Sequence, residues 1–312
     1  MKKHTLIWLL LLLVGNLTLS NVMAENPNKV WTDPAVAARE DPDFLVQGEY
    51  AGKDSGLRVA AIGEGRFYVT HYAGGLPGAG WDAGKVPNEM VDAAGVTKAA
   101  QEMKKVERES PTAGAKPPAG ALVLFDGSPN ALVQGKVSDG LLWAGAKTTK
   151  DYGSFKLHVE FREPYRPSEP LTSQNRGNSG MYLQDRYETQ ILDSFGLVFD
   201  KAQVGLPIKS DPKQWCASFY TFKTPDVPMC FPPLRWQTYD ITFQAARFDA
   251  EGKKTQNTTI SVLHNGVKIH DAVELPHGTG AASKRTEKPT GPIVFQDHGE
   301  PVAFRNVWLL EL

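Results

Sequence analysis

The sequence predicts an all-β protein whose main part is a two-sheet antiparallel sandwich of jelly-roll type. Three observations lead to this fold class. Apolar and polar residues alternate over several segments after residue 121, as half-buried strands require. Asn265-Gly266 stands between two of these segments and is the strongest short signal for a tight hairpin. This part of the chain has hardly any helix-forming pattern, so two packed antiparallel sheets are the expected arrangement.

The first 24 residues predict a secretory signal peptide. Lys2 and Lys3 precede the apolar run Leu6–Val14, and residues 22–24 offer a small-residue cleavage site. The run is too short to span a bilayer. We therefore expect an exported protein, periplasmic or extracellular, without a membrane span. The formal net charge of −1 at pH 7 gives no basic excess for a nucleic-acid partner.

Residues 25–109 predict a small β-rich N-terminal region with one helix. Segments 44–50, 57–63 and 66–72 have the composition of short strands separated by Gly-rich turns. The helix is expected over Thr97–Glu109, which is rich in Ala, Glu, Lys and Met. A Pro/Gly/Ala-rich linker over residues 110–120 then separates this region from a jelly-roll domain over 121–312.

The strands of the second domain follow in order along the chain. Residues 154–162 alternate between buried apolar and outward polar positions, and residues 236–248 do the same. Residues 258–275 form the predicted hairpin, and segments 291–299 and 304–312 supply the closing strands. No repeat of fixed period is present.

Glu188, Gln190 and Asp193 form the most informative polar group. Alternate residues of a strand share a face, so Glu188 and Gln190 point the same way. A bulge after Gln190 would bring Asp193 to that face as well. Two carboxyl groups and an amide on one face suit acid–base chemistry on a sugar, whereas a polar solvated sheet face is the alternative.

The two cysteines, Cys216 and Cys230, predict a disulfide in an exported chain. Such a bond would close a loop of about 15 residues and contribute roughly 3 kcal/mol in the chain-entropy model. Two unpaired thiols are the alternative. No Cys-x-x-Cys pattern or paired His accompanies them, so no zinc site is expected.

Three segments together resemble the 3-keto-disaccharide hydrolase family of exported bacterial proteins with a concanavalin A-like jelly roll. They are LFDG (124–127), NSGMYLQDRYETQILD (178–193) and the closing block GPIVFQDHGEPVAFRNVWLLEL (291–312). The resemblance covers residues 121–312. It implies cleavage of disaccharides or glycosides already oxidised to a ketone at C3. A C3 ketone acidifies the C2 proton, so a base can remove it before the C1 leaving group departs and water adds.

The resemblance also implies a set of site residues. The expected catalytic residues are Glu188, Asp193 and His298. The expected substrate-binding residues are Arg162, Asn178, Gln184, Gln190, Trp236, Gln296 and Arg305. Asp193 and His298 have a structural turn as their alternative, and Trp236, like Trp143, has a core position.

The implied partner is an oxidised sugar, which places the protein downstream of a sugar 3-dehydrogenase. No cofactor and no metal ligand is identified from the sequence, which leaves a bound divalent cation such as calcium open.

Two other functions remain open from the sequence. The strand Glu188-x-Gln190-x-x-Asp193 resembles the Glu-x-Asp-x-x-Glu strand of laminarinase-type glycosidases, but the middle Asp is Gln here. A retaining mechanism needs two carboxyl groups about 5–5.5 Å apart. The other alternative is a non-catalytic carbohydrate-binding module. Convergence of Glu188 and a second titratable group in one pocket would favour an enzyme.

Overall fold

The computed structural model describes residues 29–199, 205–207 and 209–312. The predicted signal peptide, residues 1–24, lies outside them. All pairings between the named strands are antiparallel, which confirms the all-β antiparallel prediction. Among the described residues, no helix has the length and apolar character needed to cross a membrane.

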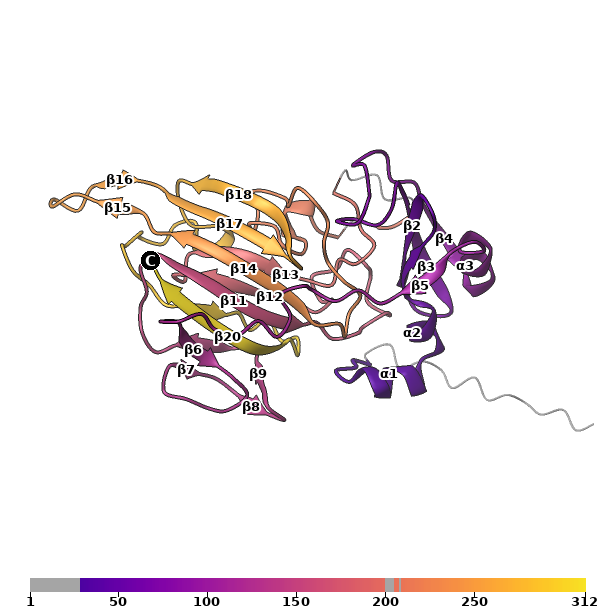
Figure 1. Cartoon of the computed structure of the whole chain (residues 1–312), viewed down its shortest axis with the longest axis horizontal. Helices are drawn as coiled ribbons and strands as arrows, with labels where there is room; N and C mark the ends of the chain where they lie inside the picture. The colour runs from indigo at the N-terminus through magenta and orange to yellow at the C-terminus, as the bar shows by residue number, and fades with distance from the viewer. Residues whose placement is uncertain (1–28, 200–204, 208) are drawn as a thin grey trace, which may run out of the picture.

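The N-terminal region holds a five-stranded sheet in the order β4-β3-β2-β1-β5, together with three short helices (Figure 1). Its elements are α1 (Pro34–Glu40), α2 (Pro42–Val46), β1 (Gly48–Ala51), β2 (Ser55–Ala61), β3 (Arg66–Ala73), β4 (Asn88–Asp92), α3 (Ala93–Ala99) and β5 (Lys104–Val106).

The single helix expected over Thr97–Glu109 is wrong over most of its length. The helix there is α3, which begins after Asp92, whose side chain accepts a hydrogen bond from Gly95 N at 2.8 Å. The chain then enters β5, which pairs with β1. Helix propensity at these positions is overridden by pairing at the open edge of the sheet. The helices α1 and α2 each begin with an Asp-Pro cap, a signal present in the sequence but not used for the prediction.

The second region forms two stacked sheets. The smaller has the strand order β13-β12-β19-β10-β7, and the larger has the order β18-β17-β14-β11-β20-β9-β8 with β6 also paired to β20. A separate ribbon, β15-β16, projects from one end (Figure 1). The elements are β6 (Leu122–Phe125), β7 (Val133–Gln134), β8 (Val137–Ser138), β9 (Leu141–Trp143), β10 (Ala146–Thr148), β11 (Phe155–Arg162), β12 (Ser179–Leu183), β13 (Tyr187–Ile191), the 3₁₀ turn η1 (Pro212–Gln214), β14 (Gln237–Gln244), β15 (Arg247–Phe248), β16 (Lys254–Gln256), β17 (Thr258–His264), β18 (Val267–Leu275), the 3₁₀ turn η2 (Gly280–Ala282), β19 (Val294–Phe295) and β20 (Ala303–Glu311).

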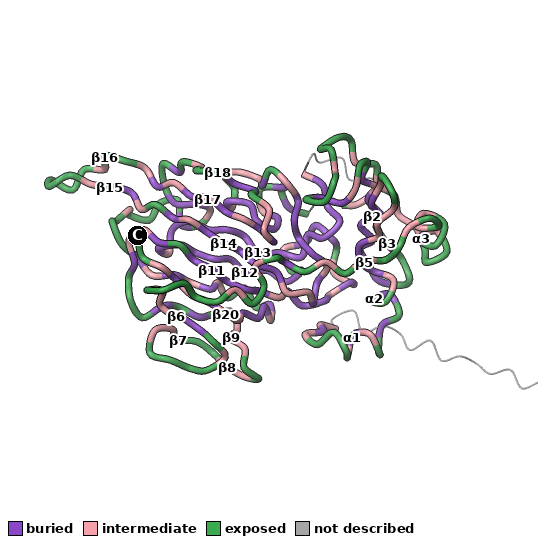
Figure 2. Tube along the Cα trace, viewed as in Figure 1, coloured by how far each residue is buried: buried purple, intermediate pink, exposed green. Residues whose placement is uncertain are grey.

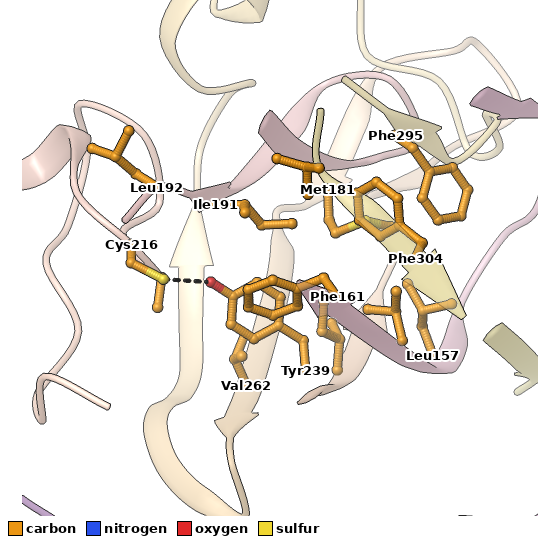
Figure 3. Packing of buried hydrophobic residues seen from close by; sticks show 14 of the residues in the cluster. Leu157, Phe161, Met181, Ile191, Leu192, Cys216, Tyr239, Val262, Phe295 and Phe304 are labelled. Atoms are coloured by element: carbon orange, nitrogen blue, oxygen red, sulfur yellow. Dashed lines mark hydrogen bonds between the residues drawn. The ribbon is translucent and has the colours of Figure 1, made fainter. Parts of the chain in front are cut away.

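The main core lies between these two sheets. Figure 3 shows Met181, Ile191 and Phe295 of the smaller sheet facing residues of the larger one such as Leu157 and Phe161, and all five are at most 1% exposed. Each comes from an alternating strand, so the residues between them point outward. The outward face of the smaller sheet is therefore the face that carries Glu188 and Gln190.

The predicted hairpin forms at Asn265-Gly266, between β17 and β18. Both turn residues have positive φ, 50° and 77°. Two consecutive residues with positive φ are what a two-residue turn of the primed type requires, and Asn-Gly tolerates them best.

The segment expected as a linker packs along the outer face of the larger sheet (Figure 1). Ser110 Oγ lies 2.6 Å from Thr238 Oγ1, and Gly114 N donates to Glu160 Oε1 at 2.6 Å.

Figure 2 shows that buried residues concentrate along β11 and β14 in the sandwich and along β2 and β3 in the N-terminal sheet. The N-terminal sheet has its own core cluster, which includes Leu57, Val59 and Phe67. The division into domains stays a prediction.

Candidate active site

Three neighbouring strands bring Glu188, Gln190 and Gln296 to the outward face of the smaller sheet. In the β12–β13 pairing, Gly180 lies opposite Gln190 and Tyr182 lies opposite Glu188. On the other side of β12, Gln296 N donates to Gly180 O at 2.9 Å. Residues that face each other across neighbouring strands share a face. Glu188 and Gln190 therefore point the same way, as the alternation predicts, and Gln296 joins them from the far end of the chain.

Gly180 lies at the centre of this face. Only glycine fits at this position, because side-chain atoms of Glu188 and Gln296 occupy the space above it. A Cβ atom at position 180 would lie 2.5 Å from Glu188 Oε1 and 3.2 Å from Gln296 Oε1. A side chain larger than hydrogen would force Glu188 to move. Two oxygen atoms thus approach the same point above Gly180 from strands on either side of it.

Glu188 is 2% exposed and has a single partner for its carboxylate within the described chain. The Tyr182 hydroxyl donates to Glu188 Oε2 at 2.7 Å. Burial raises the pKa of Glu188 to about 7, and the hydrogen bond from Tyr182 acts in the opposite direction. A carboxyl group that titrates near neutral pH can both take and return a proton under physiological conditions.

The neighbouring amides leave hydrogen-bonding capacity unused. Gln190 Nε2 donates to Gln174 Oε1 and Asn178 Oδ1, each at 3.3 Å, and to Gln214 O at 3.2 Å. Its Oε1 atom and the Oε1 atom of Gln296 are buried without a hydrogen-bond partner among the described residues. Buried polar atoms are normally paired, because an unpaired one costs about 1–3 kcal/mol. The face therefore offers acceptors that suit the hydroxyl groups of a bound sugar.

Backbone contacts hold β13 on its open edge. Tyr220 N donates to Glu188 O at 3.3 Å, and Gln190 N donates to Ser218 O at 3.0 Å. Glu188 N donates to Thr279 Oγ1 at 2.8 Å. The strand that carries Glu188 is therefore fixed by chain segments far from it in sequence.

Gln214 connects Gln190 to a cavity of about 580 Å³ that Gln214 lines together with Phe199 and residues 211–213. Gln214 O accepts from Gln190 Nε2, and Gln214 Nε2 donates to the Tyr220 hydroxyl at 2.8 Å. Burial, and next the charge of Glu188, raise the pKa of Tyr220.

The sequence analysis did not predict five residues that contact this face or its neighbours: Tyr182, Gln174, Gln214, Tyr220 and Thr279. Alternation would have found Tyr182, two residues after Gly180, once the register of the hairpin was known.

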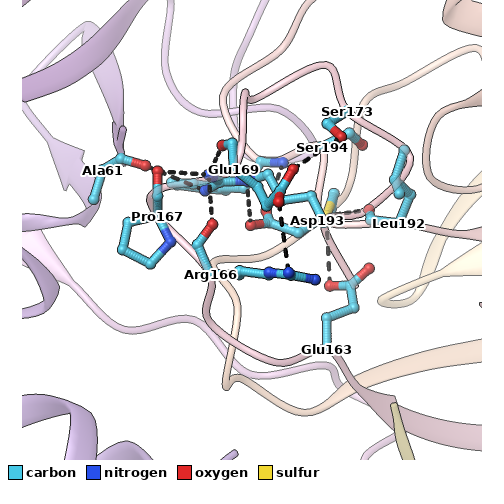
Figure 4. Close-up of polar contacts among 12 residues, drawn as sticks. Ala61, Glu163, Arg166, Pro167, Glu169, Ser173, Leu192, Asp193 and Ser194 are labelled. Carbon is cyan, nitrogen blue, oxygen red and sulfur yellow. Dashed lines mark hydrogen bonds and ion pairs between the residues drawn. The ribbon is translucent and has the colours of Figure 1, made fainter. Parts of the chain in front are cut away.

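Asp193 does not join this face. Its Oδ2 lies 2.8 Å from Arg176 Nε in a fully buried ion pair, and its Oδ1 accepts from Phe195 N at 3.2 Å. The expected bulge is absent from the β12–β13 pairing, whose register is unbroken. Figure 4 shows the Asp193 carboxylate among the polar groups of the 166–169 loop and Ala61. The shared face expected for Asp193 is therefore wrong, because the carboxylate pairs with a buried arginine instead.

The other residues expected near the smaller sheet have mixed positions. Asn178 is buried and bonds to Gln190, as described above. Gln184 occupies the β12–β13 turn with φ 53°, where its Nε2 donates to Tyr152 O at 2.9 Å and its Oε1 accepts from Arg186 Nη2 at 2.6 Å. His298 is exposed on the turn after β19 and makes no hydrogen bond or ion pair with the described residues. Of these three, only Asn178 contacts the face.

Arg162, Trp236 and Arg305 lie on the larger sheet, away from Glu188. The Cζ atoms of Arg305 and Arg162 lie 4.1 Å and 4.9 Å from the centre of the Trp236 ring. Arg305 Nε also lies 2.7 Å from Glu160 Oε2. The three residues contact one another, but on strands β11 and β20 and at the start of β14. Trp143, on β9 of the same sheet, donates from Nε1 to Ser138 Oγ at 2.8 Å.

The two cysteines are close but not bonded. Cys216 and Cys230 are both free and buried, so the predicted disulfide is not present. Each thiol instead lies near the carboxyl group of Glu163.

Comparison with known proteins identifies the family. Residues 101–310 match the family model of the 3-keto-alpha-glucoside-1,2-lyase-like domain. A crystal structure at 2.13 Å of a candidate glycosyl hydrolase from Parabacteroides distasonis superposes with a TM-score of 0.51 at 28% identity, covering 62% of this chain and 85% of that chain. A second candidate glycosyl hydrolase from the same organism, at 1.70 Å, has a TM-score of 0.45 and 18% identity over 62% of this chain and 94% of that chain. No curated protein matches the chain. Because the family model spans more than half of the sequence, and because the motifs that carry it build the Gly180 face, the chain belongs to the 3-keto-disaccharide hydrolase family, the proteins with a 3-keto-alpha-glucoside-1,2-lyase-like domain.

Proposed function

We propose that this protein cleaves glycosides whose sugar is already oxidised to a ketone at C3, with Glu188 as the acid–base group. Family membership and the likeness to a candidate glycosyl hydrolase support a glycosidase-like activity. The finer proposal, the 3-keto substrate, depends on one observation: a single buried carboxyl group with a pKa of about 7 stands beside unpaired amide oxygens.

The proposed reaction begins at C2 of the keto sugar. Glu188 Oε1, which has no partner among the described residues, takes the C2 proton, and the electrons of the C–H bond move into an enolate. Tyr182 donates to Oε2 and holds the carboxylate in place. The enolate then expels the C1 oxygen, which takes the proton held by Glu188 and leaves as an alcohol. Glu188 next takes a proton from water as the water oxygen adds to C1, and it returns that proton to C2, so the sum is hydrolysis with no change in oxidation state.

The amide of Gln296 completes the arrangement. Its side chain makes no hydrogen bond within the described residues, and its Oε1 lies over Gly180 beside Glu188. An amide carries both a donor and an acceptor. In this proposal Gln296 donates to the oxygen at C3, where negative charge develops, and Gln190 accepts from a sugar hydroxyl.

A conventional glycosidase mechanism fits this face less well. Both the retaining and the inverting routes use two carboxyl groups that flank the glycosidic bond. Asp193, the expected second carboxyl, has both oxygens engaged by Arg176 and Phe195 N. Within the described residues, no hydrogen bond or ion pair connects another carboxylate to Glu188. One carboxyl group suits a reaction in which one group removes a proton and later returns it.

Two further parts of the proposal concern the setting of the enzyme. The predicted signal peptide supports export of the protein to the periplasm or outside the cell. A substrate with a C3 ketone requires an earlier oxidation of the sugar, which a sugar 3-dehydrogenase supplies. Assay of culture fractions for this protein checks the first part.

The experiment that tests the function compares 3-keto-disaccharides with the matching unoxidised sugars and follows released monosaccharide. We expect turnover of the keto sugars alone. Deuterium at C2 of the keto sugar should slow the reaction or exchange into solvent, because the proposed route breaks the C2–H bond. Turnover of only unoxidised sugars would overturn the substrate class. Retention of deuterium without a rate effect would overturn C2 deprotonation, and binding without turnover would indicate a carbohydrate-binding module.

A further inference from the structure

A second chemical cluster lies in the main core, behind the strand that carries Glu188 and Gln190. It consists of Glu163, Cys216 and Cys230, which are 0%, 2% and 4% exposed. Cys216 Sγ lies 3.9 Å from Glu163 Oε1, and Cys230 Sγ lies 3.9 Å from Glu163 Oε2. One ligand atom from each residue lies within 4.8 Å of the others, and no second such group of three occurs among the described residues.

The described chain places no cation against Glu163, whose carboxyl group accepts from Gln237 Nε2 at 2.7 Å and contacts the two thiols. Arg176 is already paired with Asp193. A buried carboxylate without a counter-ion costs several kcal/mol, so a buried carboxyl group stays protonated or takes a cation.

We propose that Glu163, Cys216 and Cys230 bind a thiophilic divalent cation such as Zn²⁺. Two thiolates and one carboxylate are a ligand set that zinc accepts, at about 2.3 Å from sulfur and 2.0–2.2 Å from oxygen. Calcium and magnesium take oxygen ligands and do not select thiolates. Binding releases the two thiol protons and the carboxyl proton, so three negative ligands replace three neutral groups around the cation.

Tyr239 supplies a further oxygen at the same place. Its hydroxyl lies 3.4 Å from Cys216 Sγ, and Figure 3 shows these two groups facing each other. In the proposed site this oxygen would serve as a fourth ligand beside the two sulfur atoms and the Glu163 carboxylate. The same hydroxyl donates to Gln190 O at 2.7 Å.

The cation therefore has a structural role behind the strand of the active site. Glu163 follows β11, Cys216 lies in the loop after η1, and Cys230 precedes β14. Ala217, next to Cys216, donates from its backbone N to Gln190 O at 2.9 Å. A metal at this point joins three separate segments to the strand that carries Glu188 and Gln190.

Metal analysis of the full-length protein tests the proposal. The protein is unfolded, freed of metal and refolded with Zn²⁺, with Co²⁺ or with Ca²⁺ under reducing conditions. We expect about one zinc per chain and, with Co²⁺, a thiolate-to-metal charge-transfer band in the near-ultraviolet. Ca²⁺ should leave no bound metal after gel filtration. Cys216→Ser and Cys230→Ser should both lose the bound zinc and the cobalt band, whereas Glu169→Gln, a change outside the cluster, should keep them.

Two results would overturn the proposal. One is a Cys216–Cys230 disulfide in peptides of the protein isolated without reductant. The other is a refolded wild-type protein that contains no zinc and has two thiols free to react after denaturation. If the serine variants fail to fold, the wild type decides the matter, because its melting temperature should rise when it is refolded with Zn²⁺ instead of chelator. An unchanged melting temperature together with no bound zinc counts against the site.

Discussion

Glu160 and Glu188 lie on the outward faces of opposite sheets, both nearly inaccessible to solvent, yet their pKa values move in opposite directions. Burial acts upward on the pKa of Glu160, but hydrogen bonds from His158, Asn306, Gly114 N and Arg305 outweigh it and bring the pKa to about 2. Burial also acts upward on Glu188, where Tyr182 is the sole donor, and the pKa rises to about 7. Several donors lower the pKa of Glu160, whereas the single donor of Glu188 does not offset the effect of its burial.

The two faces differ in whether their buried polar groups have hydrogen-bond partners within the protein. On the larger sheet, the segment after residue 109 covers Glu160, and His158 is held by Asp240 at 2.6 Å and stacks on Trp308. On the smaller sheet, Gln190 and Gln296 keep unpaired oxygens beside Glu188. Polar groups that the protein satisfies itself stabilise the fold, and those it leaves unsatisfied are available to a ligand.

The largest expected effect is on turnover. Glu188→Gln should lower turnover of a 3-keto-glycoside by about 10²–10⁴-fold, because glutamine is nearly isosteric but cannot take a proton. Glu160→Gln should leave turnover within a few-fold, since Glu160 lies on the other sheet. Steady-state kinetics of both variants make the comparison. Equal losses in the two variants would remove the distinction between the faces, and wild-type turnover in Glu188→Gln would end its acid–base role.

A second effect concerns the space above Gly180. Gly180→Ala should lower kcat/KM on the order of 10²-fold, because a Cβ atom there would lie 2.5 Å from Glu188 Oε1 and displacement of a catalytic group by about 1 Å has that cost. Gly153→Ala is the matched control, since its Cβ would meet only Pro289 O at 3.9 Å. Both variants should keep a wild-type circular dichroism spectrum. An active Gly180→Ala enzyme would show that Glu188 need not occupy its present position.

The two carboxyl groups should also give opposite slopes in the pH dependence of stability. Glu160 has a folded-state pKa of about 2, below its unfolded value, so its contribution is complete above about pH 4.5 and is lost as the pH falls toward 2. Glu188 has a folded-state pKa of about 7, so the folded state holds its proton more tightly and stability falls as the pH rises from about 4.5 to 7.

Urea unfolding across pH 2–8 measures both slopes. Glu160→Gln should flatten the acid slope and cost about 1–3 kcal/mol at pH 7, toward the lower end because the Arg305 side chain is 41% exposed. Glu188→Gln should flatten the slope between about pH 4.5 and 7. If neither variant changes its slope, the contrast between the faces has no thermodynamic basis.

The smallest effect is expected from Tyr182→Phe. The Tyr182 hydrogen bond lowers the pKa of Glu188, so its removal should move the pH midpoint of kcat/KM upward by up to about one unit, the equivalent of one hydrogen bond. Tyr50→Phe, in the N-terminal sheet, is the control. A midpoint that moves downward would mean that Tyr182 stabilises the protonated form of the carboxyl group.

Local patterns in the sequence predicted much of the fold and part of the site. Strand alternation predicted that Glu188 and Gln190 share a face, and Asn265-Gly266 predicted the hairpin. The family motifs brought in Gln296. The shared face and the hairpin depend on residues within a few positions of one another. Gln296 is distant in sequence, but the family resemblance includes the closing segment that contains it.

The misses all depend on contacts between distant segments. Asp193 forms an ion pair with Arg176 instead of joining the face of Glu188. The other nitrogen atoms of Arg176 donate to carbonyl groups of the 166–169 loop and of Ala61. Arg162, Trp236 and Arg305 belong to a different sheet from Glu188, which periodicity within a strand does not reveal. Predicting the contact of Tyr182 with Glu188 would have needed the register of the β12–β13 hairpin. Predicting the environment of the two cysteines would have needed the position of Glu163.

The buried Arg176 has a consequence for where this protein can be cut. Its guanidinium donates to Ala61 O at 3.2 Å, and Thr70 Oγ1 donates to Gly196 O at 2.6 Å, so residues before the family match hold the chain just after β13. A fragment that begins at residue 101 keeps the whole family segment. It lacks Ala61 and Thr70, so Arg176 and Gly196 O lose these hydrogen-bond partners. The limits of the family match therefore do not coincide with the limits of the contacts around the end of β13. Its N-terminal sheet, although outside most of the family match, contacts the chain just after β13, the strand that carries Glu188.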